Sequence, residues 1–212
     1  MSDFDRSPDG LAFSKAVQQM QTRLGSRRLY ETMQWPVDIP RELAAFLTLQ
    51  RSVFLASASA DGQPYMQHRG GPPGFLHLLD SRTIAMADLR GNRQYITLGN
   101  LSENNRVLLF AMDYTNRQRV KIWGQAEVIE DDPALIERLT PPGLRADRAL
   151  LIHVSAWDQN CPQHIPQRYE ADALAEQLAR KDARIAALEQ EIATLSQQLA
   201  TREICGDDLW PQ

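Results

Sequence analysis

Cysteine and long apolar runs are both scarce in this chain, and each scarcity excludes a class of protein. The 212 residues include only Cys161 and Cys205, too few for the disulfide framework on which small secreted domains depend. No apolar run approaches the roughly 18–20 residues needed to cross a bilayer. Residues 1–10 contain three aspartates but no basic stretch followed by an apolar one, so they do not resemble a signal peptide. We therefore predict a cytoplasmic protein that makes no membrane contact.

The chain also has fewer positively charged than negatively charged residues. Lys and Arg number 23 against 27 Asp and Glu, which gives a formal net charge of −4 and a sequence pI of about 5.6. A nucleic-acid-binding protein usually has a basic excess, and a net negative field repels a polyanion. We expect no nucleic-acid partner. Hydrophobic residues make up 43% of the chain, enough for the core of one ordinary domain with an appendage.

Residues 1–50 have helical rather than strand patterns. Apolar spacing predicts a short amphipathic helix over 11–24. The stretch 35–40 is predicted to be extended, because each of its prolines disfavours helix in the residue before it. Pro40 then stands where a second helix, over 41–50, would begin. We treat 1–50 as an N-terminal helical segment.

From Ser52 onward, short apolar runs alternate with turn signals, a pattern typical of β-structure. Asp61-Gly62 is the strongest hairpin signal. Helices are expected over 92–104 and over 131–139, where two aspartates and a proline form a typical helix start. The seven predicted strands are 52–58, 63–69, 75–79, 83–87, 106–113, 119–130 and 149–157. Such strands, mostly joined by tight turns, indicate a mainly β fold: an antiparallel barrel with flanking helices.

The C-terminal region has a different period. Within 172–200, apolar residues recur at alternating spacings of four and three, and Lys181 is the one interruption. This is the a/d heptad pattern of a coiled coil, and β-branched residues at a with Leu at d favour a parallel two-stranded form. The alternative is a solitary amphipathic helix packed on the barrel. We predict a coiled-coil helix over 170–203, followed by a tail over 204–212.

Two segments have unusual chemistry for simple scaffolding. In 68–74, HRGGPPG, a strand end supplies two basic side chains, and the glycines that follow would let a flat ligand approach the backbone. In 88–94, DLRGNRQ, Gly91 permits a tight bend and Asn92 is expected to cap the next helix. Arg93 would then lie at a helix N-terminus, where the dipole, free N–H groups and a guanidinium together stabilise a phosphate.

These motifs have a family resemblance. Residues 49–130 resemble the FMN-binding split barrel of pyridoxamine 5'-phosphate oxidase-like proteins. The runs 68–74, 90–100 (RGNRQYITLGN) and 156–165 (AWDQNCPQHI) resemble those of an uncharacterised bacterial subgroup of that superfamily. The resemblance implies FMN as cofactor, a split barrel over 51–169, and a homodimer with FMN bound at its two-fold interface.

The resemblance also implies cofactor contacts position by position. The strand that touches the isoalloxazine ring in the family supplies Gln67, His68, Arg69 and Gly70 here. The next flavin-contacting strand end, often Tyr-Thr in the family, is Ala87-Asp88, and the carboxylate departs from the pattern because it would repel a phosphate. The family's phosphate-gripping Arg-Lys pair falls on Arg93-Gln94, and Arg90 would supply the charge that Gln94 lacks.

Further implied contacts lie later in the chain. Arg119 or Lys121 is placed where the family has a polar residue near the partner subunit's flavin. Trp157 and Arg168 match a Trp and an Arg at the rim of the cofactor. Arg69 and Lys121 are the candidates for the positive charge that stabilises reduced flavin.

The segment 160–165, NCPQHI, contains a cysteine and a histidine close together in sequence. Cys161 and His164 have metal-ligand spacing, but a closed zinc site needs about four ligands, and no second cysteine is near in sequence. We predict no metal site. A Cys–His nucleophilic pair would also be conceivable, although no orienting acid is identifiable. We favour a rigid loop in which Gln163 and His164 edge the flavin or substrate pocket, with simple loop packing as the alternative.

Three functions are consistent with the sequence. The first is a flavoprotein oxidoreductase acting on an unidentified small molecule, with no catalytic residue assignable. Oxidation of pyridoxamine phosphate itself is not expected, because the C-terminal Arg-x-His-type element of those oxidases is missing from the sequence. The second is a non-catalytic FMN-binding or flavin-sensing module that assembles through its coiled coil. The third is a coiled-coil scaffold whose barrel has lost its cofactor.

Overall fold

Seven antiparallel strands form a single sheet in this computed structural model, which describes residues 11–159 and 163–206. The strands are β1 (Ser52–Ala58), β2 (Pro64–Gly70), β3 (His77–Asp80), β4 (Thr83–Leu89), β5 (Arg106–Asp113), β6 (Gln118–Ile129) and β7 (Ala146–Gln159). Their hydrogen-bonded order is β2-β1-β5-β6-β7-β4-β3. The seven predicted strands are confirmed, and the bounds predicted for β1 and β5 match those of the structure.

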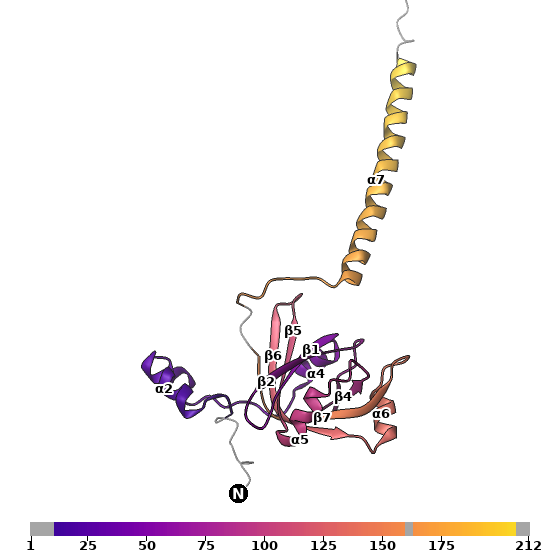
Figure 1. Ribbon diagram of the computed structural model, residues 1–212. Helices are drawn as coiled ribbons and strands as arrows, with labels where there is room; N and C mark the ends of the chain where they lie inside the picture. The colour runs from indigo at the N-terminus through magenta and orange to yellow at the C-terminus, as the bar shows by residue number, and fades with distance from the viewer. Residues whose placement is uncertain (1–10, 160–162, 207–212) are drawn as a thin grey trace, which may run out of the picture. The chain divides into compact units, whose positions relative to one another are not determined.

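The sheet curls into a barrel rather than forming a flat layer (Figure 1). Along β1 and β5, buried residues alternate with half-buried or exposed ones, because successive side chains of a strand point to opposite faces. The inward residues form one apolar core in which Leu55, Leu109 and Ile122 are fully buried. Strands β2 and β4 are not hydrogen-bonded neighbours in the sheet, yet the side chains of Arg69 and Asp88 meet.

Helices flank the barrel, with bounds that partly differ from the prediction. The structure has α2 (Lys15–Arg23), α3 (Arg27–Tyr30), α4 (Arg41–Thr48), α5 (Ile96–Glu103), α6 (Pro133–Leu139) and α7 (Ala171–Gly206). Leu43 and Leu47 of α4 join the core, and α5 and α6 contact strands of the sheet. The apolar positions of α2 are largely exposed, since only Gln21 is buried there. The sequence did not predict α3.

The outward face of β1, β5 and β6 is unusually apolar for a sheet in contact with water. Phe54 pairs with Phe110, and Leu108 pairs with Trp123, all on the face opposite the core and all only half-buried. Antiparallel sheets with one solvated face normally place polar residues there. The ring of Trp35, from the N-terminal segment, lies 5.5 Å from that of Trp123. Among the described residues, much of this face is therefore only half-buried.

The helix α7 belongs to a second unit. The chain divides into residues 1–166, which contain the barrel, and 167–212, which contain α7. The long C-terminal helix expected from the sequence is confirmed, and it is 36 residues long. Among the described residues, no helix combines the length and apolar character needed to span a membrane.

Candidate functional site

An arginine-rich pocket opens where β2, the end of β4, the loop before α5 and the start of β7 come together. Tyr65, Gln67 and Arg69 line it from β2. They share one face of that strand because side chains two residues apart point the same way. Residues 88–98 contribute a continuous wall, and Asp147 and Arg148 contribute the side formed by β7. The pocket therefore unites most of the two motifs singled out in the sequence.

The loop before α5 has a less regular geometry than the sequence indicates. The predicted helix over 92–104 begins only at Ile96, so Arg93 and Gln94 lie in the loop and not in the first helical turn. Asn92 does not cap the helix; its Oδ1 accepts a hydrogen bond from the Gln94 backbone N–H at 3.2 Å. Arg93 and Tyr95 both have left-handed backbone angles, with φ of 59° and 56°. A left-handed residue interrupts the helical path, which is why the helix starts late.

Two hydrogen bonds fix this loop against the first hairpin. The Thr97 hydroxyl donates to Gln67 Oε1 at 2.8 Å, and the side-chain amide of Asn100 donates to Ser57 Oγ at 3.0 Å. Thr97 is only 2% exposed. A left-handed conformation of a residue other than glycine costs roughly 1–2 kcal/mol, and such strain persists only where the surroundings enforce it. These contacts hold the strained loop at the pocket.

Asp88 lies between two arginines of the pocket. Its carboxylate accepts hydrogen bonds from Arg69 at 2.5 Å and from Arg148 at 3.4 Å, and the side chains of Asp88 and Arg69 are only 11% and 12% exposed. Arg148, its cross-strand neighbour, also donates to Glu130 at 2.7 Å. That hydrogen bond is the main reason why the pKa of Arg148 is raised. Asp88 therefore bridges two arginines, and its contact with the cofactor stays a prediction.

A second ion pair, Arg90 with Asp147, also lines the pocket and is more exposed. Arg90 donates to both carboxylate oxygens of Asp147 at 2.6–3.0 Å. The hydrogen bond with Arg90 lowers the pKa of Asp147, and the charge of Arg93 lowers it further. Arg93 itself has no ion-pair partner among the described residues. Its guanidinium is thus the cation most available to a ligand.

Charge and size together define what the pocket can hold. Four arginines and two aspartates line it, so its formal charge is +2. The Nε of Arg69 is buried and has no hydrogen-bond partner among the described residues, and a buried unpaired donor costs about 1–3 kcal/mol. The cavity volume is about 60 Å³, far below the roughly 300–1,000 Å³ of sites that enclose a whole small molecule. The pocket therefore fits a phosphate-sized anion, and a larger ligand would extend out of it.

Comparison with known proteins agrees with this architecture. Residues 39–161 match the family model described as pyridoxamine 5'-phosphate oxidase, and this match covers more than half of the chain. The chain belongs to the pyridoxamine 5'-phosphate oxidase family. Its barrel is accordingly the split barrel of that family. The search of curated proteins found no match.

Solved structures with a similar fold are distant in sequence. A pyridoxamine 5'-phosphate oxidase-like protein, so described, from Lactobacillus delbrueckii is 20% identical, with 58% of this chain and 95% of that one covered and a TM-score of 0.47. HupZ of Group A Streptococcus is 15% identical, with 62% and 100% covered and a TM-score of 0.48. An FMN-binding protein from Syntrophomonas wolfei is 11% identical, with 69% and 96% covered and a TM-score of 0.44.

The alternation of β2 divides the site residues implied by the family resemblance. Gln67 and Arg69 face the pocket, whereas His68 points to the opposite face, where its Nε2 is 2.8 Å from Ser52 Oγ and its ring lies 5.8 Å from that of Phe54. At Gly70 an added Cβ would come within 2.9 Å of the His68 ring and 3.1 Å of the Arg51 carbonyl oxygen. A side chain at this position would therefore require the His68 ring to move and the Arg51 backbone to shift slightly. His68 and Gln67 are not brought together.

The remaining implied contacts lie outside the pocket. Ala87 packs against a small apolar cluster around Leu139 of α6. Arg119 and Lys121 lie on the outward face of β6; Arg119 has a buried Nε without a partner among the described residues, and Lys121 donates to Asp158 at 3.3 Å. The cationic side chains of β6 therefore lie outside the pocket that the four arginines line.

Of the C-terminal candidates, Trp157, Gln163 and His164 do not line the pocket either. Trp157 packs against the core, and its indole N–H donates to the Asp38 carbonyl oxygen at 3.0 Å. Gln163 and His164 are exposed and His164 has φ of 64°, while Arg168 belongs to the second unit. Cys161 lies outside the described residues. Across the part of the chain that is described, no three His, Cys, Asp or Glu side chains gather as a metal site would require.

Several pocket residues were not predicted from the sequence: Tyr65, Tyr95, Thr97, Asp147 and Arg148. Arg148 was missed because β7 begins at Ala146, three residues before its predicted start. The guanidinium of Arg148 also lies 5.5 Å from the centre of the Tyr95 ring, a contact between residues 53 positions apart in the chain. Period-two alternation could have indicated Tyr65, since Gln67 and Arg69 were already candidates.

Proposed function

We propose that the protein is an FMN-binding flavoprotein, an oxidoreductase that acts on a small molecule whose identity is open. The family is one of oxidases, and the coarse class follows from membership in it. The observation that carries the FMN proposal is the pocket: a formal charge of +2, a buried Arg69 Nε without a partner, and Arg93 without an ion pair among the described residues. A phosphate carries about −1.5 to −2 at neutral pH, which matches this charge.

The residues suited to the phosphate end of FMN are those with unused donors. Arg69 would offer its Nε while its terminal nitrogen stays on Asp88, and Arg93 would offer its whole guanidinium. Arginine forks bind phosphate oxygens with two parallel hydrogen bonds. FMN would supply the electron and hydride chemistry, and the protein would supply binding, orientation and charge.

The flavin ring does not fit the pocket, which leads us to propose a homodimer. The cavity of about 60 Å³ is too small for three fused rings. The apolar outward face of β1, β5 and β6 carries a separate hollow of about 400 Å³ lined by Ala56, Leu108 and Trp123 among others. An uncovered apolar sheet face of this kind marks an interaction surface. If two copies pack through it, Arg119 and Lys121 would approach the partner's cofactor.

The decisive experiment compares two arginines that share exposure and backbone conformation. Arg93 lies in the pocket, and Arg117 lies in the β5–β6 turn, with φ of 59° and 54°. We expect purified protein to bind FMN, seen by its absorption spectrum and by titration. Arg93→Ala should weaken binding about 10- to 100-fold, because a hydrogen bond to a charged group contributes about 1.5–3 kcal/mol. Arg117→Ala should leave binding unchanged.

Two results would contradict the proposal. Protein that stays colourless and ignores added FMN would remove the cofactor and favour the scaffold hypothesis. FMN binding that Arg93→Ala and Arg117→Ala affect equally would show that the phosphate lies elsewhere. Arg93→Lys is a useful third variant, since it keeps the charge but loses the planar fork, and we expect it to recover only part of the affinity.

A non-catalytic FMN-binding module remains the second candidate, favoured by one observation. The side chains lining the pocket include no histidine and no cysteine, and its two carboxylates are paired with arginines. A group able to transfer a proton must reach the substrate, and in the described pocket lining only the phenols of Tyr65 and Tyr95 stand outside those ion pairs. Tight FMN binding without reduction by any nicotinamide or thiol donor would favour the module over the oxidoreductase.

A further inference from the structure

The helix α7 carries an apolar stripe along one side. Its a positions are Leu178, Ile185, Ile192 and Leu199, and its d positions are Leu174, Lys181, Leu188 and Leu195. The seven apolar residues of this stripe are 38–63% exposed. Helices draw most of their stability from packing an apolar face, so a helix of 36 residues with this stripe open to water lacks its partner.

We propose that α7 pairs with α7 of a second copy of the chain in a parallel, in-register, two-stranded coiled coil. Isoleucine at a, here Ile185 and Ile192, with leucine at d, here Leu188 and Leu195, is the pattern that favours two parallel strands. The stripe is as narrow as a coiled-coil seam, with Ala, Gln, Glu and Arg at the other positions. This pairing does not depend on whether the barrel binds FMN.

Charges beside the stripe complement one another in the parallel orientation. Arg184 is at a g position, and Glu189 is at the e position five residues later. In a parallel pair, g of one helix faces the following e of the other, so Arg184 would meet the partner's Glu189, and the same contact would recur by symmetry. In an antiparallel pair, e faces e and g faces g. Where Asp182 met the partner's Glu189, Arg184 would meet the partner's Glu191, so the choice of orientation rests on Ile at a and Leu at d.

Lys181 is the only charged residue on the stripe, and it lowers the stability of the pair. In the in-register parallel pair, d positions face each other, so Lys181 would lie opposite the partner's Lys181, with the partner's Asp182 at the next position. Its long stem can pack in the seam while the ammonium reaches this carboxylate, which offsets part of the repulsion between the two ammonium groups. A shift by one heptad would set Lys181 against an apolar side chain in two layers and leave the end layers of the stripe unpaired.

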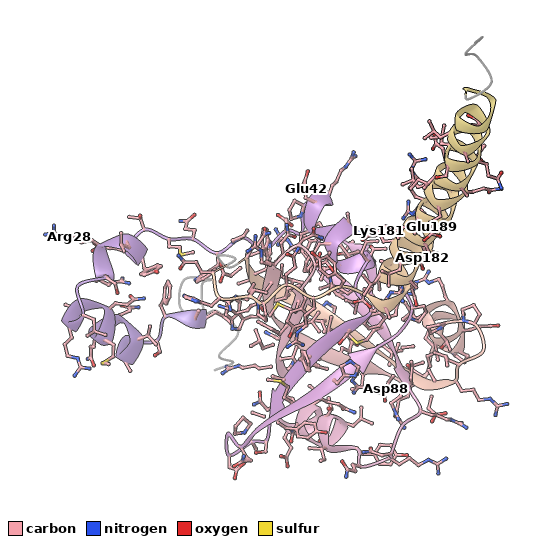
Figure 2. The ribbon with its side chains drawn as sticks, turned by 90° about the horizontal axis from the view of Figure 1, so that it is seen from above. Arg28, Glu42, Asp88, Lys181, Asp182 and Glu189 are labelled. Atoms are coloured by element: carbon pink, nitrogen blue, oxygen red, sulfur yellow. The ribbon has the colours of Figure 1, made fainter. Side chains whose placement is uncertain are left out.

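Within one chain these charges are unused. Figure 2 labels Lys181, Asp182 and Glu189 along α7. Among the described residues, the ion pair found on this helix is Arg180–Glu176, at 3.9 Å, and both of its residues lie at outer positions, c and f. Neither Arg184 nor Glu189 forms an ion pair with another described residue. The charges that flank the stripe are therefore available to a second copy.

Disulfide cross-linking of the full chain tests the pairing. In a Cys161→Ser, Cys205→Ser background, Ile192→Cys places a thiol at an a position, and Gln190→Cys places one at an outer f position of the same turn. A disulfide needs Cα atoms about 4.4–6.8 Å apart, a separation that a–a' positions of a parallel pair can meet. We expect Ile192→Cys to become a covalent dimer under mild oxidation, and Gln190→Cys to stay largely uncross-linked. The control shares the same barrel, so dimerisation of the barrel alone cannot produce the difference.

Orientation is tested with the ends of the stripe. Leu178→Cys alone should cross-link in a parallel pair. In an antiparallel pair it would not, because an a position then faces a d' position, and only a mixture of Leu178→Cys with Leu195→Cys would give a covalent dimer. That result would overturn the proposal. So would an Ile192→Cys chain that stays monomeric in denaturing gels, as expected if α7 packs on its own barrel.

Charge reversal separates this pairing from any other helix packing. Arg184→Glu should lower the melting midpoint of helical circular dichroism, and adding Glu189→Arg should restore it, because the g–e' pair is reformed with its signs exchanged. Lys181→Leu should raise the midpoint and weaken the preference for one register. Failure of the double variant to recover the midpoint, with Ile192→Cys uncross-linked, would refute the coiled coil.

Discussion

The barrel and α7 differ in how many of their charged and apolar side chains are paired or buried within the chain. In the barrel, the least exposed arginines are paired within the chain, Arg69 with Asp88 and Arg148 with both Asp88 and Glu130. Its inward apolar residues are fully buried. On α7, the apolar stripe is exposed and its flanking charges have no partner among the described residues. Most charged and apolar groups of the barrel thus have partners within the same chain, whereas we propose that α7 finds its partner in a second chain.

The barrel and α7 therefore lack different kinds of partner. Among the described residues, the barrel lacks partners for a few groups: the buried Nε atoms of Arg69 and Arg119, the buried Nε1 of Trp35, and the guanidinium of Arg93. It also lacks a full cover for its apolar outward face. A ligand and a docked copy would supply them without refolding. The helix α7 lacks its entire packing surface. We therefore expect the barrel to tolerate the loss of a partner far better than α7 does.

The largest expected effect comes from matched leucine truncations in the two units. Leu109 of β5 is fully buried, whereas Leu188 of α7 is 38% exposed. Leu109→Ala should lower the free energy of unfolding of the barrel by about 2–5 kcal/mol, as removal of buried methyl groups does. Leu188→Ala should leave barrel unfolding unchanged. Denaturant titration followed by tryptophan fluorescence, in a Trp210→Phe background, reports on the barrel through Trp35, Trp123 and Trp157. Equal losses from both variants would mean that α7 stabilises the barrel directly.

A smaller effect is expected at Asp88, which lies in the barrel (Figure 2). Asp88→Asn removes the carboxylate shared by Arg69 and Arg148 and should destabilise the unliganded barrel by about 1–3 kcal/mol, since weakly exposed donors lose their acceptor. The same change raises the formal charge of the pocket from +2 to +3 and should therefore tighten FMN binding.

Asp147→Asn is the matched control for Asp88. It adds the same charge to the pocket lining, but its carboxylate is 39% exposed, and exposed ion pairs contribute little to stability. We expect both variants to bind FMN more tightly and only Asp88→Asn to melt at a lower temperature. If Asp88→Asn weakens FMN binding, Asp88 organises the site and does not compete with the phosphate.

The sequence predicted the strands well because their signals are local. Asp61-Gly62 forms a turn between paired strands, with Gly62 at φ of 91°, and period-two burial along β1 and β5 follows directly from the pleat. The family resemblance rested on motifs of the same local kind. It led to the correct family and to Gln67, Arg69 and Arg93 at the pocket.

The pocket's charge balance could not be predicted in this way, because it depends on contacts far apart in the chain. Arg148 reaches Asp88 across 60 positions, and the two strands carrying Arg69 and Asp88 are not neighbours in the sheet. The late start of α5 results from a left-handed Tyr95 held by Arg148 and by the neighbouring Thr97–Gln67 bond. The coiled coil, the homodimer and the cytoplasmic location stay predictions.

Backbone strain gives a third, smaller test. Arg93 and Arg117 are both left-handed, and replacement by glycine removes a cost of roughly 1–2 kcal/mol while adding about 0.5–1 kcal/mol of unfolded-state entropy. Arg93→Gly and Arg117→Gly should each raise stability slightly. Only Arg93→Gly should lower FMN affinity, because it also removes the guanidinium that we assign to the phosphate. Equal affinities in the two variants would show that this guanidinium does not bind FMN.

The smallest expected effect is a pH dependence confined to the barrel. Burial lowers the pKa of His77 on β3 below its ordinary value of 6.5, and the charge of Arg138 lowers it further. A histidine with a depressed folded pKa stabilises the fold at pH values above its unfolded pKa, and this stability is lost as the pH falls through the folded pKa. The barrel should therefore melt at a lower temperature below pH 6.5, and His77→Gln should reduce this change. Residues 171–206 contain no histidine, so the melting of α7 should not share this dependence. If His77→Gln leaves the pH profile of the barrel unaltered, His153, which pairs with Glu127 at 3.1 Å, is the next histidine to test.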